Sequence, residues 1–130
     1  MTKKIVAVVD DLIFVSKIQQ TATLVGVRVE MVALGKLELP ENAVAAIILD
    51  LNHRSGRAIE ILRALKEDSS TQGIPVIGFL SHVQADLAAA AREAGCDVLM
   101  ARSAFTAQLP QLLRKYGGQE IGAAEKRASL

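Results

Sequence analysis

Two uninterrupted apolar runs that each end in aspartate constrain the fold of this chain more than any other feature. Residues 5–9 are followed directly by Asp10 and Asp11, and residues 44–49 are followed by Asp50. Short aliphatic runs of this kind are typical of strands buried on both faces, as in a parallel sheet covered by helices. We therefore expect a layered α/β fold with carboxylates at its strand ends.

The rest of the sequence alternates between helical and strand patterns. Apolar residues at helical spacing predict helices over residues 12–25, 55–66, 83–94 and 103–116, with Ser103 as the N-cap of the last helix. Further strands are predicted over residues 27–31, 75–80 and 97–100, whereas residues 33–42 leave little room for a full helix. Strands that alternate with helices require right-handed crossovers, so the order predicts a doubly wound parallel sheet.

Composition limits the classes of function. The chain has 130 residues, which is the size of one domain, and its 15 basic and 14 acidic residues leave a net charge of +1. That charge gives no strong field for nucleic acid or membrane. A single cysteine, Cys96, excludes a disulfide framework and favours a reducing cytosol. We expect a cytoplasmic protein in which residues 1–116 form the domain and residues 117–130 a flexible tail.

Three acidic side chains fall at corresponding strand ends. Asp10 and Asp11 follow the first strand and Asp50 follows the third. The carboxyl ends of neighbouring parallel strands meet at one edge of the sheet, where ligands bind. Carboxylates gathered there repel one another unless a cation or protons intervene. Mg²⁺ prefers oxygen ligands and often binds together with a phosphate, so the pattern predicts a magnesium-assisted phosphoryl site.

Two histidines follow the third and fourth strands and give a second interpretation of the same edge. His53 and His82 would form a transition-metal site with Asp50 if both faced the pocket, because imidazole and carboxylate suit zinc or iron. The alternative is that both histidines are exposed loop residues.

Taken together, these motifs resemble the receiver domain of two-component response regulators, the family of the chemotaxis switch protein. Residues 8–11 resemble the family's strand with its acidic pair, and residues 46–52 resemble the strand that ends in the phosphoacceptor aspartate. Residues 95–105 resemble the segment usually written G-A-D-x-Y-L-x-K-P-F. The resemblance covers residues 3–116 and implies a flavodoxin-like fold with five parallel strands and, here, a shortened second helix.

The resemblance also implies roles for individual residues. Asp50 would accept a phosphoryl group from a histidine kinase or a phosphotransfer protein in a phosphorelay. Ser81 would supply the hydroxyl that binds the phosphoryl oxygens, and Arg102 would pair with the acyl phosphate. The implied ligands of Mg²⁺ are Asp10, Asp11, Asp50 and the backbone carbonyl of Asn52.

Several positions depart from the family pattern. Arg102 replaces the usual lysine, Ser103 the proline that follows it, and Leu99 the aromatic switch residue. Counted along the fourth strand, Leu80 occupies the hydroxyl position and Ser81 lies one residue later. One step along a strand moves a side chain to the other face, so the sequence leaves open which of the two faces the pocket.

Two interpretations of function follow. The first is a stand-alone receiver-like signalling protein whose affinity for a downstream protein changes when Asp50 is phosphorylated. The second is a phosphorylation-independent pseudo-receiver used for docking or homodimerisation, in which Arg102 neutralises the pocket as a built-in counter-ion. Residues 83–94 and the last helix, with Phe105, Leu109 and Leu113, would form its contact face. No glycine-rich phosphate loop follows the first strand, and we do not expect an enzyme.

Overall fold

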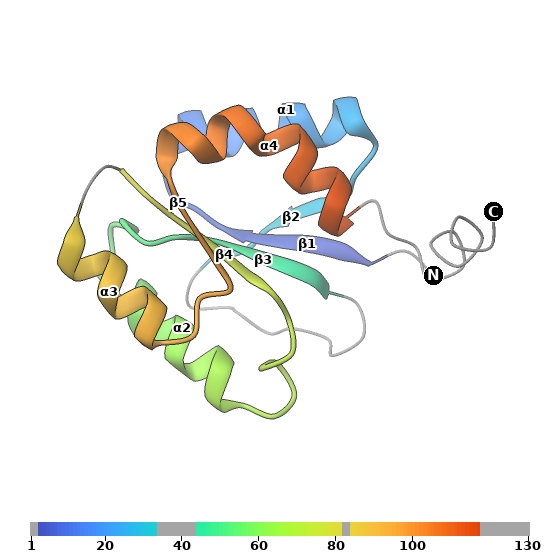
Figure 1. Cartoon of the computed structure of the whole chain (residues 1–130). Coiled ribbons are helices and arrows are strands. Elements are labelled where there is room, and N and C mark those ends of the chain that lie inside the picture. The colour runs from blue at the N-terminus through green and yellow to red at the C-terminus, as the bar shows by residue number, and fades with distance from the viewer. Residues whose placement is uncertain (1–2, 34–43, 82–83, 118–130) are drawn as a thin grey trace.

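A computed structural model describes residues 3–33, 44–81 and 84–117 of the chain (Figure 1). Its elements, in chain order, are β1 (Lys4–Val8), α1 (Leu12–Val25), β2 (Val29–Met31), β3 (Val44–Asp50), α2 (Ala58–Glu67), β4 (Val76–Leu80), α3 (Ala85–Glu93), β5 (Val98–Ala101) and α4 (Arg102–Gly117). The predicted short second helix and His82 lie outside the described residues. No helix in the described ranges is long and apolar enough to cross a membrane.

The five strands form one sheet in the order β2-β1-β3-β4-β5, and every neighbouring pair is parallel. Helices α1 and α4 cover one face, and α2 and α3 cover the other (Figure 1). This confirms the predicted doubly wound α/β fold. The strand order reverses between β1 and β3, and a crevice for ligands is expected outside the carboxyl ends of those two strands.

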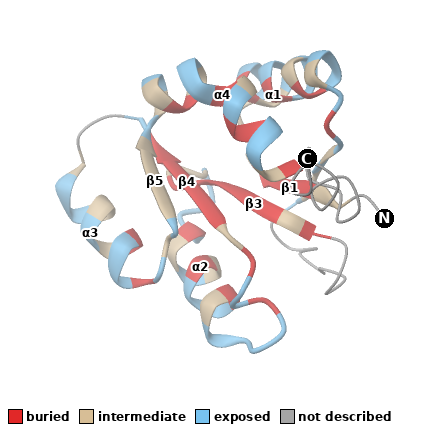
Figure 2. Cartoon of the chain, turned by 45° about the vertical axis from the view of Figure 1, so that its right-hand side comes forward, coloured by how far each residue is buried: buried red, intermediate tan, exposed pale blue. Residues whose placement is uncertain are grey.

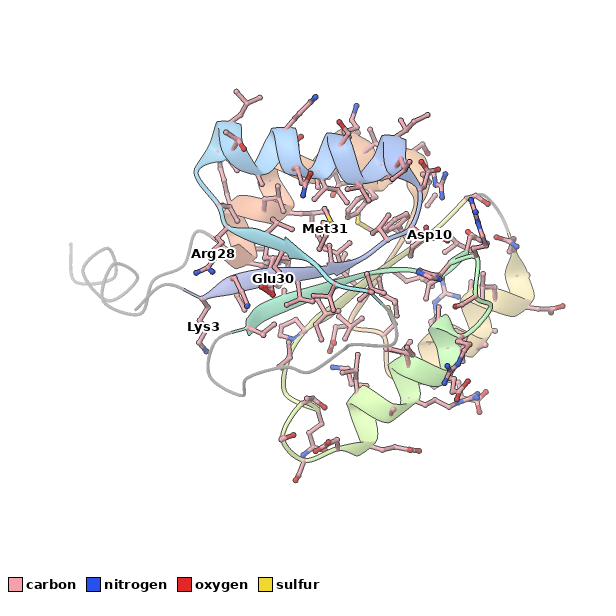
Figure 3. The ribbon with its side chains drawn as sticks, turned by 180° about the vertical axis from the view of Figure 1, so that it is seen from behind. Lys3, Asp10, Arg28, Glu30 and Met31 are labelled. Carbon is pink, nitrogen blue, oxygen red and sulfur yellow. The ribbon has the colours of Figure 1, made fainter. Side chains whose placement is uncertain are left out.

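Burial explains why the apolar runs become interior strands. The side chains of β3 and β4 are almost all buried between the two helical layers (Figure 2). By contrast, β2 is a short edge strand, and Figure 3 shows it from behind with Glu30 and Met31 labelled. Glu30 of this strand pairs with Lys4 of β1 at 2.9 Å. The alternation of apolar and polar residues over residues 27–31 therefore predicted an edge strand correctly, whereas the continuous apolar runs became interior strands.

All three phenylalanines of the chain gather on the face covered by α1 and α4. The ring of Phe79 on β4 stacks between Phe14 of α1 and Phe105 of α4, with ring centroids 5.0 and 4.5 Å away. Phe105, Leu109 and Leu113 are fully buried in this layer. They are therefore core residues and not available to the contact face predicted on this helix, because α4 needs these side chains to pack on the sheet.

The last helix begins and ends differently from its sequence pattern. It starts at Arg102, directly after β5, so Ser103 lies in the first turn and the predicted N-cap role is wrong. It ends at Gly117, which is buried although the tail was expected to start there. A Cβ atom on Gly117 would lie 2.9 Å from Cδ1 of Ile5 and closer still to Cγ1 of Val27. Gly117 is therefore part of the packed domain.

The close approach at Gly117 leads to a stability prediction. We expect Gly117→Ala to lower the free energy of unfolding by about 1–3 kcal/mol, because the added methyl group overpacks against Val27 and Ile5. Gly73→Ala is the matched control, since a Cβ there meets no atom within 4 Å, and its effect should stay within about 0.5 kcal/mol. Urea unfolding measures both. Equal stabilities would show that the α4 terminus is not packed as described.

Candidate functional site

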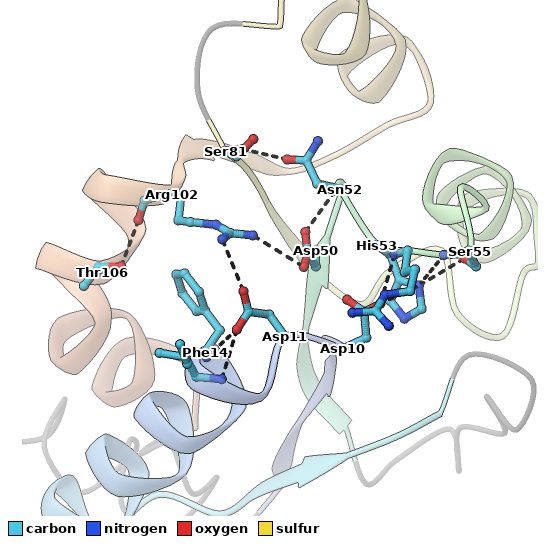
Figure 4. Close-up of polar contacts among 12 residues, drawn as sticks. Asp10, Asp11, Phe14, Asp50, Asn52, His53, Ser55, Ser81, Arg102 and Thr106 are labelled. Carbon is cyan, nitrogen blue, oxygen red and sulfur yellow. Dashed lines mark hydrogen bonds and ion pairs between the residues drawn. The ribbon is translucent and has the colours of Figure 1, made fainter.

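A pocket of about 570 Å³ opens at the carboxyl ends of β1 and β3, where the strand order reverses. Figure 4 shows its polar contacts. The lining residues are Asp10, Asp11, Leu12, Ile13, Asp50, Asn52, Arg54 and Arg102. The structure thus brings the three carboxylates of the sequence analysis into one pocket, together with two of the other residues singled out there, Asn52 and Arg102.

Asp50 is the last residue of β3 and is only 1% exposed. One carboxylate oxygen, Oδ1, accepts a hydrogen bond from the backbone N–H of Asn52 at 2.9 Å. The other, Oδ2, lies 3.8 Å from Nη2 of Arg102. Burial raises the pKa of the Asp50 carboxyl, and the charge of Asp10 adds to this, while the Asn52 N–H and Arg102 oppose it. Asp50 is therefore a buried carboxylate whose ionised form costs free energy.

Asp11 is held by the start of the first helix. As the N-cap of α1, it accepts hydrogen bonds at Oδ1 from the backbone N–H groups of Ile13 at 3.0 Å and Phe14 at 3.3 Å. Its Oδ2 lies 3.5 Å from Nη1 of Arg102. One oxygen of Asp11 is thus committed to the helix, and the other faces the guanidinium.

Asp10 points toward the loop that follows β3. Its Oδ2 accepts a hydrogen bond from the backbone N–H of Arg54 at 3.0 Å and lies 3.9 Å from Nδ1 of His53. His53 in turn hydrogen-bonds through Nδ1 with Ser55 Oγ at 3.0 Å. The loop between β3 and α2 therefore anchors Asp10 on the side of the pocket away from Arg102.

Arg102 lies between two of the carboxylates (Figure 4). Its guanidinium carbon sits 4.7 Å from the ring centroid of Phe14 and 5.8 Å from that of Phe79. A guanidinium over an aromatic face is attracted by the ring quadrupole. Its Nε is buried without a hydrogen-bond partner among the described residues. Aromatic contact and two ion pairs thus set the position of the guanidinium.

The end of β4 resolves the register that the sequence leaves open for Leu80. This side chain is 5% exposed and packs in the core beneath α2 and α3. Ser81 is exposed, and its backbone N–H donates to Oδ1 of Asn52 at 2.6 Å. The Asn52 Nδ2 also donates to Gln84 Oε1 at 2.7 Å. Asn52 therefore joins the ends of β3 and β4 through its side chain.

The described conformation does not fit a divalent ion. The carboxylate oxygens have the right chemistry for Mg²⁺. However, the guanidinium of Arg102 stands between Asp11 and Asp50, and Asp10 is turned to the Arg54 amide. Among the residues that the structure places, no three His, Cys, Asp or Glu side chains are arranged to hold a metal. The predicted metal sites, with magnesium or with a transition metal, stay predictions.

Three of the contacts that position the polar groups of this pocket were not predicted from the sequence. Phe14 forms the platform beneath Arg102, Gln84 holds Asn52, and the amide of Arg54 binds Asp10. Only Phe14 had a usable signal, because it lies three residues after the capping Asp11 and so on the same side of the first helical turn. The other two contacts join loops whose approach depends on the folded chain.

Comparisons with known proteins bear on the fold. No family model matches the sequence, and no curated protein matches it. Among solved structures, a putative response regulator from Chloroflexus aurantiacus is similar with a TM-score of 0.76 at 16% identity, covering 92% of this chain and 100% of the other. The Mn²⁺-bound form of the response regulator Rcp1 is similar with a TM-score of 0.72 at 17% identity, covering 92% of this chain and 97% of the other. The phosphorylated cyanobacterial phytochrome response regulator RcpA gives 0.68 at 22% identity, covering 88% and 91%.

At these identities the likeness shows the fold. The chain has the flavodoxin-like fold of response-regulator receiver domains over most of its length, as its motifs predict.

The buried carboxylate gives a prediction with a defined sign. Because burial raises the pKa of Asp50, its ionised form destabilises the folded state. The contribution of Asp50 to the free energy of unfolding is therefore fully present below the ordinary carboxyl pKa. It is lost as pH rises through the raised pKa. Asp50→Asn carries no charge. We expect it to be more stable than the parent by about 0.5–2 kcal/mol at about pH 7, and this advantage to shrink toward zero near about pH 4.

Urea unfolding of both proteins across that pH range is the measurement. Asp68→Asn serves as the control of opposite sign, because hydrogen bonds from the backbone N–H and the hydroxyl of Ser70 lower the pKa of Asp68. Its stability should fall below that of the parent at neutral pH and approach it in acid. A parent more stable than Asp50→Asn at neutral pH would mean that the contact with Arg102 outweighs the cost of burial.

Proposed function

We propose that this chain is a receiver-like signalling protein that accepts a phosphoryl group at Asp50. The observation that carries the proposal is a carboxylate at the carboxyl end of the central strand, with Oδ1 fixed by the Asn52 N–H and Oδ2 directed at a guanidinium. Such a carboxylate is held in one orientation as a nucleophile. The receiver fold supports the proposal, and one of the similar structures is phosphorylated.

The donor is proposed to be a phosphohistidine on a histidine kinase or a phosphotransfer protein. An oxygen of the Asp50 carboxylate attacks the phosphorus, and the new O–P bond forms as the P–N bond to the donor breaks. The donor imidazole keeps the electron pair and takes a proton from solvent. The fixed fork of the Arg102 guanidinium suits the transferred phosphoryl oxygens, because it presents two parallel N–H donors.

Phosphorylation would then be transmitted through Arg102. A phosphoryl group on Asp50 would draw the guanidinium toward itself and away from the Oδ2 of Asp11, which now lies 3.5 Å from Nη1. Asp11 caps α1, and Arg102 is the first residue of α4. Moving the guanidinium toward the phosphoryl group therefore loosens a contact between the two helices on one face of the sheet. A downstream protein that contacts those helices would detect the change.

The second candidate is a phosphorylation-independent docking or dimerisation module. Two observations favour it. Arg102 already forms an ion pair with Asp50, and Leu80, at the position where the family pattern has a hydroxyl, is buried in the core. The large exposed apolar side chains of the described chain all lie on α1, namely Leu12, Ile13 and Leu24, each more than 80% exposed. Leu12 and Ile13 are adjacent at the start of this helix and Leu24 is near its end, and exposed apolar side chains of this kind are available for contacts with another protein. These exposed side chains support a contact face on α1 for this candidate, and the contact face predicted over residues 83–94 stays a prediction.

Phosphoryl acceptance can be tested by labelling. We expect acetyl phosphate, or a phosphohistidine donor, to add one phosphoryl group per chain, measured by intact mass. Asp50→Asn should abolish the label, because it removes the nucleophilic oxygen. Asp68→Asn, which changes an exposed loop carboxylate far along the chain, should label as the parent does. An unlabelled parent, or label that survives in Asp50→Asn, would contradict the first candidate.

Amide NMR separates the two candidates by the path of the response. If Arg102 transmits the signal, beryllofluoride should shift amides at the start of α1, near Asp11, and at the start of α4, near Arg102. Changes at the far end of α1, near Val25, should be much smaller. Spectra that stay unchanged even beside Asp50 would favour the docking module. Shifts spread only over α2 and α3 would contradict the role given to Arg102.

A further inference from the structure

Each carboxylate of the pocket already has a positive or N–H partner from this chain. Arg102 lies 3.5 Å from Asp11 and 3.8 Å from Asp50, while Asp10 accepts the backbone N–H of Arg54. We propose that the guanidinium of Arg102 is the resident cation of the pocket and that it excludes divalent metal ions from the native protein.

The positions of the guanidinium nitrogens of Arg102 support the exclusion of a divalent ion from the pocket. The two terminal nitrogens of one guanidinium divide between two carboxylates, with Nη1 facing Asp11 and Nη2 facing Asp50. A divalent ion bound to both carboxylates would have to share this space with the guanidinium. Like charges at such separations repel strongly, and more so where one carboxylate is shielded from water as Asp50 is. Metal binding therefore requires Arg102 to leave.

Leaving is opposed by contacts that do not involve the acids. The guanidinium lies over the ring of Phe14, which itself packs on Phe79 in the core. Arg102 is only 30% exposed at its side chain and begins α4, so its backbone is fixed by the helix. A lysine or glutamine on the surface would swing away freely, whereas this side chain must give up an aromatic face and two ion pairs together.

The inference goes beyond phosphoryl transfer and does not rest on it, because metal binding is measured without a phosphodonor. Metal binding by the parent would overturn this proposal without bearing on phosphorylation of Asp50. Absence of a phosphoryl label on Asp50 would contradict the proposed function without bearing on the role of Arg102 as the cation of the pocket.

Titration with Mn²⁺, followed by electron paramagnetic resonance and water-proton relaxation, tests the proposal. The parent should show no saturable site up to millimolar Mn²⁺. Arg102→Met keeps an apolar stem over Phe14 but removes the charge, and it should bind Mn²⁺ about tenfold or more tightly than the parent. Adding Asp11→Asn to Arg102→Met should remove the gain.

Arg54→Met is the matched control. Its side chain also lies near a pocket acid, with Nε 3.8 Å from Asp10 Oδ2, but it is 90% exposed and lies between no pair of carboxylates. It removes the same unit of charge and should bind Mn²⁺ no more than about twofold tighter than the parent. An equal gain in Mn²⁺ affinity in Arg102→Met and Arg54→Met would show that only the net charge of the protein matters, and it would overturn the proposal.

The parent alone also decides the question if Arg102→Met does not fold. Saturable Mn²⁺ binding to the parent, with paramagnetic broadening centred on the amides of Asp50 and Asn52, would show a pocket open to metal despite Arg102. That result overturns the proposal, and so does a folded Arg102→Met that binds no better than the parent. A parent without such broadening supports it.

Discussion

The contact of Arg102 with Phe14, Asp11 and Asp50 is the interaction on which the rest of the site depends. The ring beneath the guanidinium belongs to the aromatic layer that packs α1 and α4 on the sheet, through Phe79 and Phe105. The pocket and the core of that face are therefore one packed unit. A charge introduced at Asp50 acts on a side chain that cannot move without disturbing the junction of two helices.

Much of the fold follows from local patterns. A continuous apolar run that is too short for a helix must be a strand covered on both faces, and an alternating one lies at an edge, as β3 and β2 show. The ends of α4 do not follow, because Arg102 takes helical conformation as soon as β5 stops, and Gly117 is fixed by contacts with Ile5 and Val27 from distant parts of the chain. Such boundaries are set by packing between elements.

The site divides in the same way. Asp10, Asp11 and Asp50 share a pocket because equivalent ends of neighbouring parallel strands share an edge, which the sequence order already implies. The sequence left the balance of charge open, because Arg102 was a candidate counter-ion beside a bound cation. Three acids suggested an unsatisfied cation site, whereas in the fold an arginine far along the chain, an amide of a loop and a helix terminus satisfy them. The helix terminus is a local partner, two and three residues beyond Asp11, and Arg102 was already a candidate counter-ion. The contact of Asp10 with the Arg54 amide joins distant parts of the chain, so spacing does not indicate it.

A pocket that is satisfied without ligand limits how far any ligand can shift the protein. A phosphoryl group biases a conformational equilibrium only by the difference in its interaction with the two states. At Asp50 it would gain the guanidinium, but the protein would lose the contacts of that guanidinium with Asp11 and with the face of Phe14. The two terms oppose each other. The amplitude of signalling therefore depends on how much better the guanidinium binds a doubly charged phosphoryl group than a carboxylate. The fork geometry favours the phosphoryl group, while the aromatic platform favours the present state.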